Sequence, residues 1–177
     1  LLLMRPDDPL RAFLVTSATP REGKTTTSTT IAISLAGSTG RAVLVDTDMR
    51  RPRVHKIFGK SNDRGLTNFI LGESDDIEDF VQKTVVPGLY VLPCGPIPPN
   101  PGEIMHAARF AEVVRQLREK FGAVIYDSSP INVVSDGLVL SSMVDGVILV
   151  VHANNSKRDQ AREAVRSLRS VGARILG

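Results

Sequence analysis

Cysteine and tryptophan are nearly missing from this sequence, which has one cysteine, Cys94, and no tryptophan. A single cysteine cannot form a disulfide within the chain, so a reducing, cytoplasmic setting fits best and Cys94 is expected to be structural. The histidines are too widely spaced in the sequence to suggest a zinc site together with Cys94. They are His55, His106 and His152. We therefore expect neither disulfides nor structural zinc to stabilise the fold.

Long apolar runs and a strong charge imbalance are also lacking. No apolar run approaches the roughly 20 residues that a membrane-spanning helix requires, and residues 1–4 are followed at once by charged residues and proline. The net charge of +3 is spread along the chain, so it gives no argument for binding nucleic acid. The sequence thus predicts no signal peptide, no membrane span and no nucleic-acid partner.

What is present is enough apolar sequence to form one core. Hydrophobic residues make up 42% of the 177 residues, which predicts a single domain over residues 1–177. Short apolar runs rich in β-branched residues predict strands at residues 12–15, 42–45, 89–92, 123–126 and 146–151. Because these runs are mostly continuous rather than alternating, they predict strands buried on both faces, as in a parallel sheet covered by helices.

Apolar residues at helical spacing lie between these strands, in residues 24–36, 110–121 and 160–171. The alternation of strands and helices predicts an α/β fold with a doubly wound, mostly parallel sheet. We interpret the polar residues 51–87 as an insertion with short helices at 66–71 and 77–83. Residues 93–102 are rich in proline and glycine and predict a stiff loop before the next helix.

A phosphate-binding loop is predicted after the first strand, where residues 18–25 read Ala-Thr-Pro-Arg-Glu-Gly-Lys-Thr. In such a P-loop the backbone amides surround a phosphate, Lys24 reaches the β- and γ-phosphates, and the Thr25 hydroxyl binds Mg²⁺. Ala18 and Arg21 stand where glycine would suit a close backbone approach better. The alternative is a Gly-Lys-Thr tripeptide that begins a helix by chance. The predicted nucleotide-binding residues are Thr19, Arg21, Glu22, Gly23, Lys24, Thr25 and Thr26.

Aspartates end two of the predicted strands: Asp46 and Asp48 follow residues 42–45, and Asp127 follows residues 123–126. Because parallel strands share one carboxyl end, these side chains are expected beside the P-loop. By itself Asp127 would be a helix cap or turn residue. Together the motifs predict Mg²⁺ ligands at Thr25, Asp46 and Asp127. They also predict catalytic roles for Lys24, Asp46 and Asp48, with either aspartate accepting a proton from the attacking hydroxyl or water.

The most specific motif of the chain is the run Val-Leu-Val-Asp-Thr-Asp-Met-Arg-Arg-Pro at residues 43–52, followed by His55 and Phe58-Gly59. This run resembles the Walker A′ motif of the bacterial tyrosine kinases of capsule and exopolysaccharide synthesis. Further blocks that resemble the same family are residues 65–67, 92–101 and 127–130 and the pair Asp136-Gly137. The likeness extends over essentially the whole chain.

The resemblance implies a P-loop ATPase fold of the partition/Mrp type that binds ATP with Mg²⁺ and transfers phosphate to tyrosines. It also implies a homo-oligomeric ring in which each subunit phosphorylates the tyrosine-rich tail of its neighbour. A membrane chain-length regulator would activate the kinase at the inner face of the plasma membrane.

Several family segments have no match here: a strand with an adenine-contacting asparagine, the tyrosine cluster and an assembly helix. We therefore expect this sequence to be a piece of a longer polypeptide, either with or without a transmembrane regulator ahead of this domain. The two tyrosines present, Tyr90 and Tyr126, fall within predicted strands and are expected to be structural.

Two other functions stay open at the level of the sequence. One is a partitioning or positioning ATPase of the same fold, although such proteins carry a second lysine early in the P-loop, where this chain has Thr19. The other is a non-catalytic nucleotide-sensing module that assembles with a membrane protein of polysaccharide export.

Two basic groups also allow two interpretations each. One group follows the acidic strand end and is either a solvated turn or part of the site; it comprises Arg50, Arg51, Arg53 and Lys56. The other lies on the last predicted helix and is either a solvated face or a contact to a subunit or anionic lipid; it comprises Lys157, Arg158, Arg162, Arg166 and Arg169. His55 is expected to pack or cap locally, with a minor role near the site as the alternative.

Overall fold

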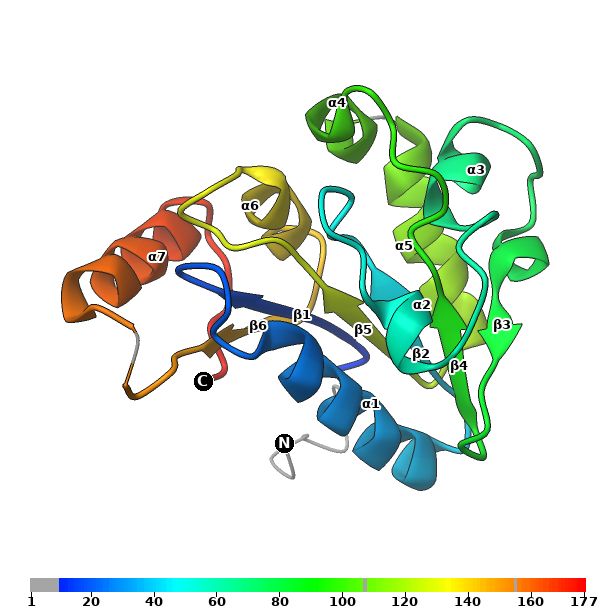
Figure 1. Cartoon of the computed structure of the whole chain (residues 1–177), viewed down its shortest axis with the longest axis horizontal. Coiled ribbons are helices and arrows are strands. Elements are labelled where there is room, and N and C mark those ends of the chain that lie inside the picture. Colours follow the sequence, from blue (N-terminus) through cyan, green and yellow to red (C-terminus); the bar gives the residue numbers. More distant parts are fainter. Residues whose placement is uncertain (1–9, 107, 155) are drawn as a thin grey trace.

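The computed structural model describes residues 10–106, 108–154 and 156–177. Helices cover both faces of a central sheet with the strand order β3-β4-β2-β5-β1-β6 (Figure 1). All pairs are parallel except the antiparallel pair β3 and β4. The strands are β1 (Ala12–Ser17), β2 (Ala42–Asp46), β3 (Gln82–Lys83), β4 (Leu89–Leu92), β5 (Ala123–Asp127) and β6 (Gly146–Val150). The predicted doubly wound, mostly parallel sheet is confirmed.

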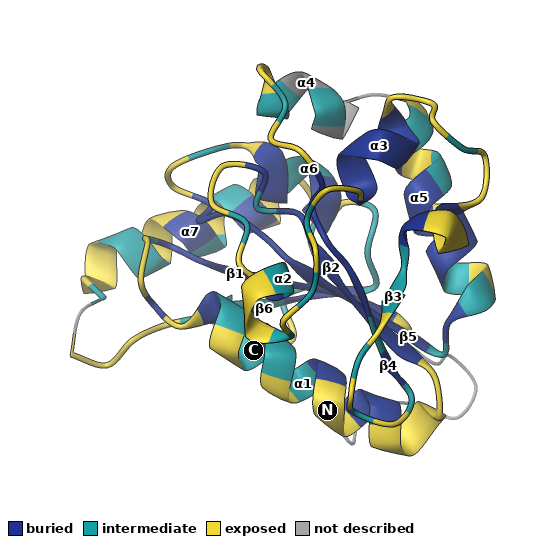
Figure 2. Ribbon diagram, turned by 45° about the vertical axis from the view of Figure 1, so that its right-hand side comes forward, coloured by how far each residue is buried: buried dark blue, intermediate teal, exposed yellow. Residues whose placement is uncertain are grey.

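The core is divided into two layers because alternate residues of each strand point to opposite faces. On one face, Phe13, Leu44 and Ile125 pack with α1 (Lys24–Thr39) and α2 (Val54–Ile57). On the other face, strand residues pack against the larger set of helices, α3 (Leu66–Ile70), α5 (Ala108–Lys120), α6 (Asp136–Ser141) and α7 (Arg158–Ser170). The central strands are buried along their length, whereas α1 exposes its outer side (Figure 2). Burial on both faces explains why the strand sequences are continuously apolar.

The structure differs from the sequence prediction in its short elements. The predicted helix at residues 77–83 is instead the 3₁₀-helix η1 (Ile77–Phe80) followed by β3, because Gln82 and Lys83 pair with β4. Helices α2 and α6 were not predicted. Helix α4 (Pro101–His106) begins inside the predicted stiff loop, since a proline at the first helical position loses no hydrogen bond.

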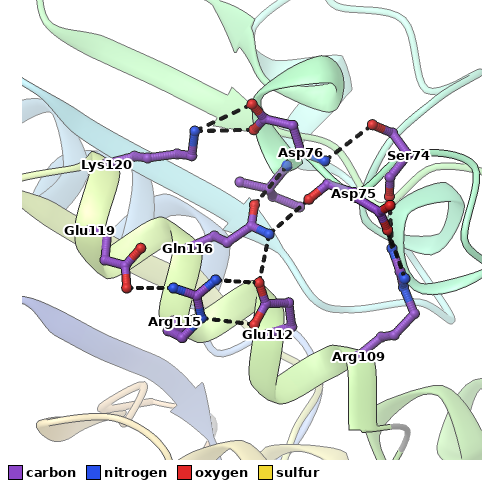
Figure 3. Close-up of polar contacts among 10 residues, drawn as sticks. Ser74, Asp75, Asp76, Arg109, Glu112, Arg115, Gln116, Glu119 and Lys120 are labelled. Atoms are coloured by element: carbon purple, nitrogen blue, oxygen red, sulfur yellow. Dashed lines mark hydrogen bonds and ion pairs between the residues drawn. The ribbon is translucent and has the colours of Figure 1, made fainter.

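Residues 51–87, predicted as an insertion, pack closely onto the sheet and onto α5. Phe69 and Phe80 are buried and meet edge to face at 6.3 Å between ring centroids. Polar contacts tie the same segment to α5 (Figure 3): the Gln116 side chain accepts a hydrogen bond from the Ile77 amide at 3.0 Å, and Lys120 pairs with Asp76 at 3.1 Å. We call this set the α5 network; it comprises Ser74, Asp75, Asp76, Ile77, Arg109, Glu112, Arg115, Gln116, Glu119 and Lys120.

The two tyrosines have different surroundings. Tyr126 is completely buried, and Tyr90 is half-buried with its ring edge to face against Phe121 at 5.5 Å. Both lie in strands, as predicted. None of the helices in the described part of the chain is long and apolar enough to cross a bilayer.

Candidate active site

A pocket of about 690 Å³ opens at the carboxyl end of the sheet, where β1, β2 and β5 end. The segments that follow these strands supply its walls. Its lining residues are Pro20, Arg21, Gly23, Lys24, Thr25, Thr26, Asp48, Arg50, Arg51, Arg53, Ser129, Pro130, Val133 and Val134. The three motifs that are far apart in the sequence therefore meet at one end of the sheet, as the parallel arrangement predicts.

The predicted P-loop connects β1 to α1 and has an unusual backbone. Arg21 is the one non-glycine residue with a positive φ, 66°, in the described part of the chain, and Gly23 has a φ of 95° where it caps α1. The left-handed conformation costs a residue with a side chain roughly 1 kcal/mol, which is why glycine suited position 21 better in the sequence analysis. Strain of this kind is found at ligand-binding loops, where the backbone must curl around a ligand.

Glu22 holds the P-loop from behind. Its side chain is buried, and it accepts hydrogen bonds from the Thr19 amide at 2.7 Å and from the Ser156 hydroxyl. Burial alone would raise the pKa of Glu22, but the hydrogen bonds from Ser156 and Thr19 hold it below its usual value. Glu22 and Thr19 are absent from the pocket lining, so they shape the loop that was predicted to bind nucleotide.

Lys24 begins α1 and lines the pocket with only 9% of its surface exposed. Burial lowers the pKa of Lys24, while the negative charges of Asp127, Asp48 and Glu22 oppose this shift. A largely buried ammonium at the start of a helix suits a phosphate, because the helix N-terminus adds backbone amides and positive partial charge. Thr25 follows it in the lining, as the predicted magnesium ligand requires.

Asp46 and Asp127 lie opposite each other on the neighbouring strands β2 and β5. Asp46 is completely buried, and its Oδ2 accepts hydrogen bonds from the amides of Arg53 and Val54 at 2.8 and 2.9 Å. Burial, and then the charge of Asp127, raises the pKa of Asp46 to about 8. Asp46 is absent from the pocket lining. Its contacts fix the start of α2 and the turn before it.

Asp127 is 2% exposed, and burial raises its pKa to about 6 against the hydrogen bonds of Thr25 and Ser28. Its Oδ1 has no hydrogen-bond partner among the described residues. A buried carboxylate oxygen without a donor fits a cation. Within the described residues no cluster of three or more His, Cys, Asp or Glu could hold a metal. Mg²⁺ instead takes one or two protein ligands together with phosphate oxygens and waters, and the Thr25 and Asp127 oxygens fit that mode.

Asp48 lines the pocket and is held in place on several sides. Its Oδ1 accepts hydrogen bonds from the Ser129 hydroxyl at 2.8 Å and from the Arg51 amide at 3.1 Å. The other carboxylate oxygen, Oδ2, accepts no hydrogen bond from the described residues, so it is available to a ligand in the pocket. Of the three predicted acids, Asp48 therefore has the position best suited to accept a proton.

The structure brings most of the predicted site together. Arg21, Gly23, Lys24, Thr25, Thr26 and Asp48 line the pocket. Glu22, Asp46 and Asp127 are buried outside its lining, and the Thr19 amide donates a hydrogen bond to Glu22. Ser129 and Pro130, which belong to the family-like block at residues 127–130, also line the pocket, and sequence reasoning missed Val133 and Val134 beside them. The available signal was their position after Asp127 at a strand end, which parallels the position of Asp48 after β2.

Comparison with known proteins agrees with this geometry. A family model described as an AAA domain matches residues 22–169. The chain is 34% identical to the tyrosine-protein kinase YwqD of Bacillus subtilis over 97% of this chain and 72% of that protein. It is 35% identical to the tyrosine-protein kinase CpsD of Streptococcus agalactiae over 94% of this chain and 73% of that protein.

Solved structures show the same likeness. The chimerical protein CapA2B2 matches with a TM-score of 0.91 and 33% identity over 97% of this chain and 76% of that chain. The VpsO kinase domain matches with a TM-score of 0.89 and 36% identity over 94% and 81%. The septum site-determining protein MinD of Pyrococcus horikoshii, solved with Mg-ADP, has a TM-score of 0.78 at 20% identity over 94% and 68% and shares the fold. With its fold, its pocket and these relatives, the chain belongs to the AAA domain family and, within it, to the bacterial tyrosine-protein kinases.

Proposed function

We propose that this protein is a tyrosine kinase of capsular or exopolysaccharide synthesis that uses ATP and Mg²⁺ in the pocket at the carboxyl end of the sheet. One observation carries the proposal: Lys24 and Asp48 line a pocket of about 690 Å³ beside a strained P-loop, and Asp127, with its partnerless Oδ1, lies buried close enough to Lys24 to interact with its charge. Phosphoryl transfer depends mainly on positioning and on neutralising charge, and these residues supply both.

The phosphates are held by the P-loop in this proposal. The amides between Arg21 and Thr26 surround them, and the Lys24 ammonium offsets their charge. Thr25 and Asp127 would hold the metal, which when bound neutralises charge on the β- and γ-phosphate oxygens. Binding of a nucleotide with Mg²⁺ is supported by the shared fold of the MinD structure, which contains Mg-ADP.

Asp48 is the group that we propose to orient the tyrosine hydroxyl and accept its proton. Asp48 lines the pocket. Asp46 instead accepts hydrogen bonds at Oδ2 from two backbone amides at the start of α2. We assign Asp46 a positioning role, because it fixes the turn that carries Asp48 and the following arginines. Its predicted part in holding Mg²⁺ stays a prediction.

The acceptor tyrosine comes from outside the described core. Tyr126 is completely buried and Tyr90 packs against Phe121, so neither side chain is presented to the pocket. This supports transfer between subunits of a homo-oligomer to a tyrosine-rich tail. A membrane chain-length regulator would then recruit and activate the protein at the inner face of the plasma membrane.

The decisive experiment measures tyrosine phosphorylation with [γ-³²P]ATP and Mg²⁺ in the presence of the membrane partner. We expect label on tyrosine, and we expect Lys24→Met to abolish it by removing the charge that holds the phosphates. Lys120→Met is the matched control, because that lysine lies in the α5 network and pairs with Asp76 and Glu78.

Other outcomes would identify the competing functions. ATP hydrolysis stimulated by DNA or lipid, without phosphotyrosine, would replace the kinase with a positioning ATPase. Nucleotide-dependent assembly without any phosphate transfer would indicate a nucleotide-sensing module. If Lys24→Met leaves nucleotide binding unchanged, the pocket itself is wrongly assigned.

A further inference from the structure

The pocket extends past the P-loop toward β2 and β5, and this part is strongly basic. Arg50, Arg51 and Arg53 follow β2 and line it. The Arg50 guanidinium lies 3.5 Å from the buried carboxylate of Asp136. Arg51 and Arg53 are exposed, and within the described part of the chain neither guanidinium forms an ion pair with an acidic side chain. Two cations are thus left facing a pocket without a protein counter-charge.

The nucleotide does not account for these two arginines. Lys24, the helix start and the loop amides are the groups placed at the phosphates, and Mg²⁺ offsets much of the remaining charge. Arg53 is close enough to Lys24 for its charge to lower the pKa of that lysine. Asp48 is the one acid among the described lining residues, and Arg51 and Arg53 add positive charge beyond it, which favours an anionic ligand in the pocket.

Apolar residues also line the pocket. Pro130, Val133 and Val134 line it, and Val133 is 57% exposed. An aromatic ring packs well against such a surface while its hydroxyl stays in the polar region, where Asp48 is fixed by Ser129. The pocket therefore combines a surface for a ring, a fixed carboxylate for its hydroxyl and two open cations beside them.

We propose, building on the proposed kinase function, that the acceptor is a tyrosine flanked by acidic residues, and that Arg51 and Arg53 select it. The ring packs on Pro130, Val133 and Val134, and the flanking carboxylates pair with the two guanidinium groups. The tyrosine oxygen then bonds to the γ-phosphorus, the bond from that phosphorus to the β–γ bridging oxygen breaks, ADP leaves and the phenolic proton passes to Asp48.

The test compares three tyrosine peptides that are identical except for flanking glutamates, glutamines or lysines. With the 177-residue chain, ATP and Mg²⁺, we expect the lowest KM for the glutamate peptide and the highest for the lysine peptide. The Arg51→Ala/Arg53→Ala variant should raise the KM for the glutamate peptide roughly tenfold, as for two partly exposed charge pairs, and leave the KM for ATP unchanged. The Arg51→Glu/Arg53→Glu variant should instead favour the lysine peptide.

Matched controls and a binding measurement separate the outcomes. Arg162→Ala/Arg166→Ala removes the same charge from the exposed side of α7, outside the pocket, and should change no peptide KM. Fluorescence anisotropy of labelled peptides with ADP and Mg²⁺ reports binding even without transfer. Selective binding of the glutamate peptide, with no transfer even when the membrane partner is added, would overturn the kinase function but support the acidic selection. Equal affinity for all three peptides, or an equal rise in the KM for ATP, would overturn the selection.

Discussion

Acidic side chains are held in opposite states in two regions of this molecule, the pocket and the α5 network. Behind the pocket, Asp46 and Asp127 are almost completely buried, and burial raises their pKa values to about 8 and about 6. In the α5 network, hydrogen bonds from Arg115 and Gln116 lower the pKa of Glu112 to about 2 (Figure 3). The same kind of group is pushed toward its neutral form in one region and kept charged in the other.

The difference shows which region is arranged for folding and which for chemistry. In the α5 network, side chains of the folded protein itself donate hydrogen bonds to the carboxylates, so no ligand is needed to pair with them. Behind the pocket, the Asp127 Oδ1 lacks a donor among the described residues, and its charge faces that of Asp46. Such an arrangement destabilises the folded protein when no ligand is bound. Active sites commonly retain such unfavourable groups because a bound cation can pair with them.

Asp127→Asn should give the largest effect, because it removes the charge of a buried carboxyl behind the pocket. We expect phosphoryl transfer to fall about 100-fold or more, because an amide is a poorer magnesium ligand than a carboxylate. The ligand-free variant should nevertheless be more stable than the parent protein at pH 8, by at most about 3 kcal/mol. Because the folded state raises the pKa of Asp127, this carboxyl contributes its full stabilisation below about pH 4 and loses it as the pH rises through about 6. Asparagine cannot ionise, so the variant lacks this pH-dependent loss.

Urea titrations at pH 5 and pH 8 without nucleotide measure this stability. The difference between the Asp127→Asn variant and the parent protein should be larger at pH 8. Asp76→Asn is the matched control from the α5 network, where hydrogen bonds from the Glu78 amide and Lys120 lower the pKa of Asp76. The charged Asp76 carboxylate stabilises the folded protein above about pH 4, and this stabilisation is lost as the pH falls. The Asp76→Asn variant should therefore be less stable than the parent protein at pH 8. An Asp127→Asn variant with the same pH trend as Asp76→Asn would contradict the assignment.

Gln116→Ala should give an intermediate effect and test the buried part of the α5 network. The Gln116 side chain is buried, accepts from the Ile77 amide at 3.0 Å and donates to the Asp75 carbonyl at 2.9 Å. Its removal leaves a buried amide without a partner, which should cost about 2 kcal/mol of unfolding free energy in a urea titration. Kinase activity below the unfolding transition should be unchanged. Gln82→Ala, which removes one exposed hydrogen bond, should cost much less.

Arg115→Ala should give the smallest effect. Arg115 pairs with Glu112 and Glu119 at 2.5 and 2.6 Å, but the three side chains lie at the surface of α5. Water and salt screen such pairs, and ordering the long side chains offsets most of the gain. We expect no measurable change in urea midpoint or activity. A loss as large as that of Gln116→Ala would show that these exposed ion pairs within α5 stabilise the protein as much as the buried amide does.

The long strands, the long helices and the P-loop could be predicted because their signals are local. An apolar run, a helical spacing and a strand–loop–helix motif each lie within a short stretch of sequence, and the carboxyl ends of parallel strands meet by geometry. The short elements could not be predicted in the same way. Gln82 and Lys83 form a strand through pairing with Tyr90 and Val91, and this partner lies outside the local pattern.

The roles of the individual aspartates also needed the tertiary structure. In the sequence, Asp46 and Asp48 are equivalent acids two positions apart at a strand end. Folding turns Asp46 to the amides of Arg53 and Val54, and it leaves Asp48 in the pocket against Ser129. The wall of Pro130, Val133 and Val134 likewise became visible only when β5 was placed beside β2.

Local patterns were sufficient to predict the buried strands, the P-loop and the end of the sheet that bears the acids, because backbone chemistry and strand direction fix these features. The folded arrangement was needed to show which acid lines the pocket, which accepts hydrogen bonds from backbone amides and which arginines form no ion pair among the described residues. Those distinctions depend on contacts between residues far apart in the chain, and a side chain's partners, rather than its type, set its protonation state and its role.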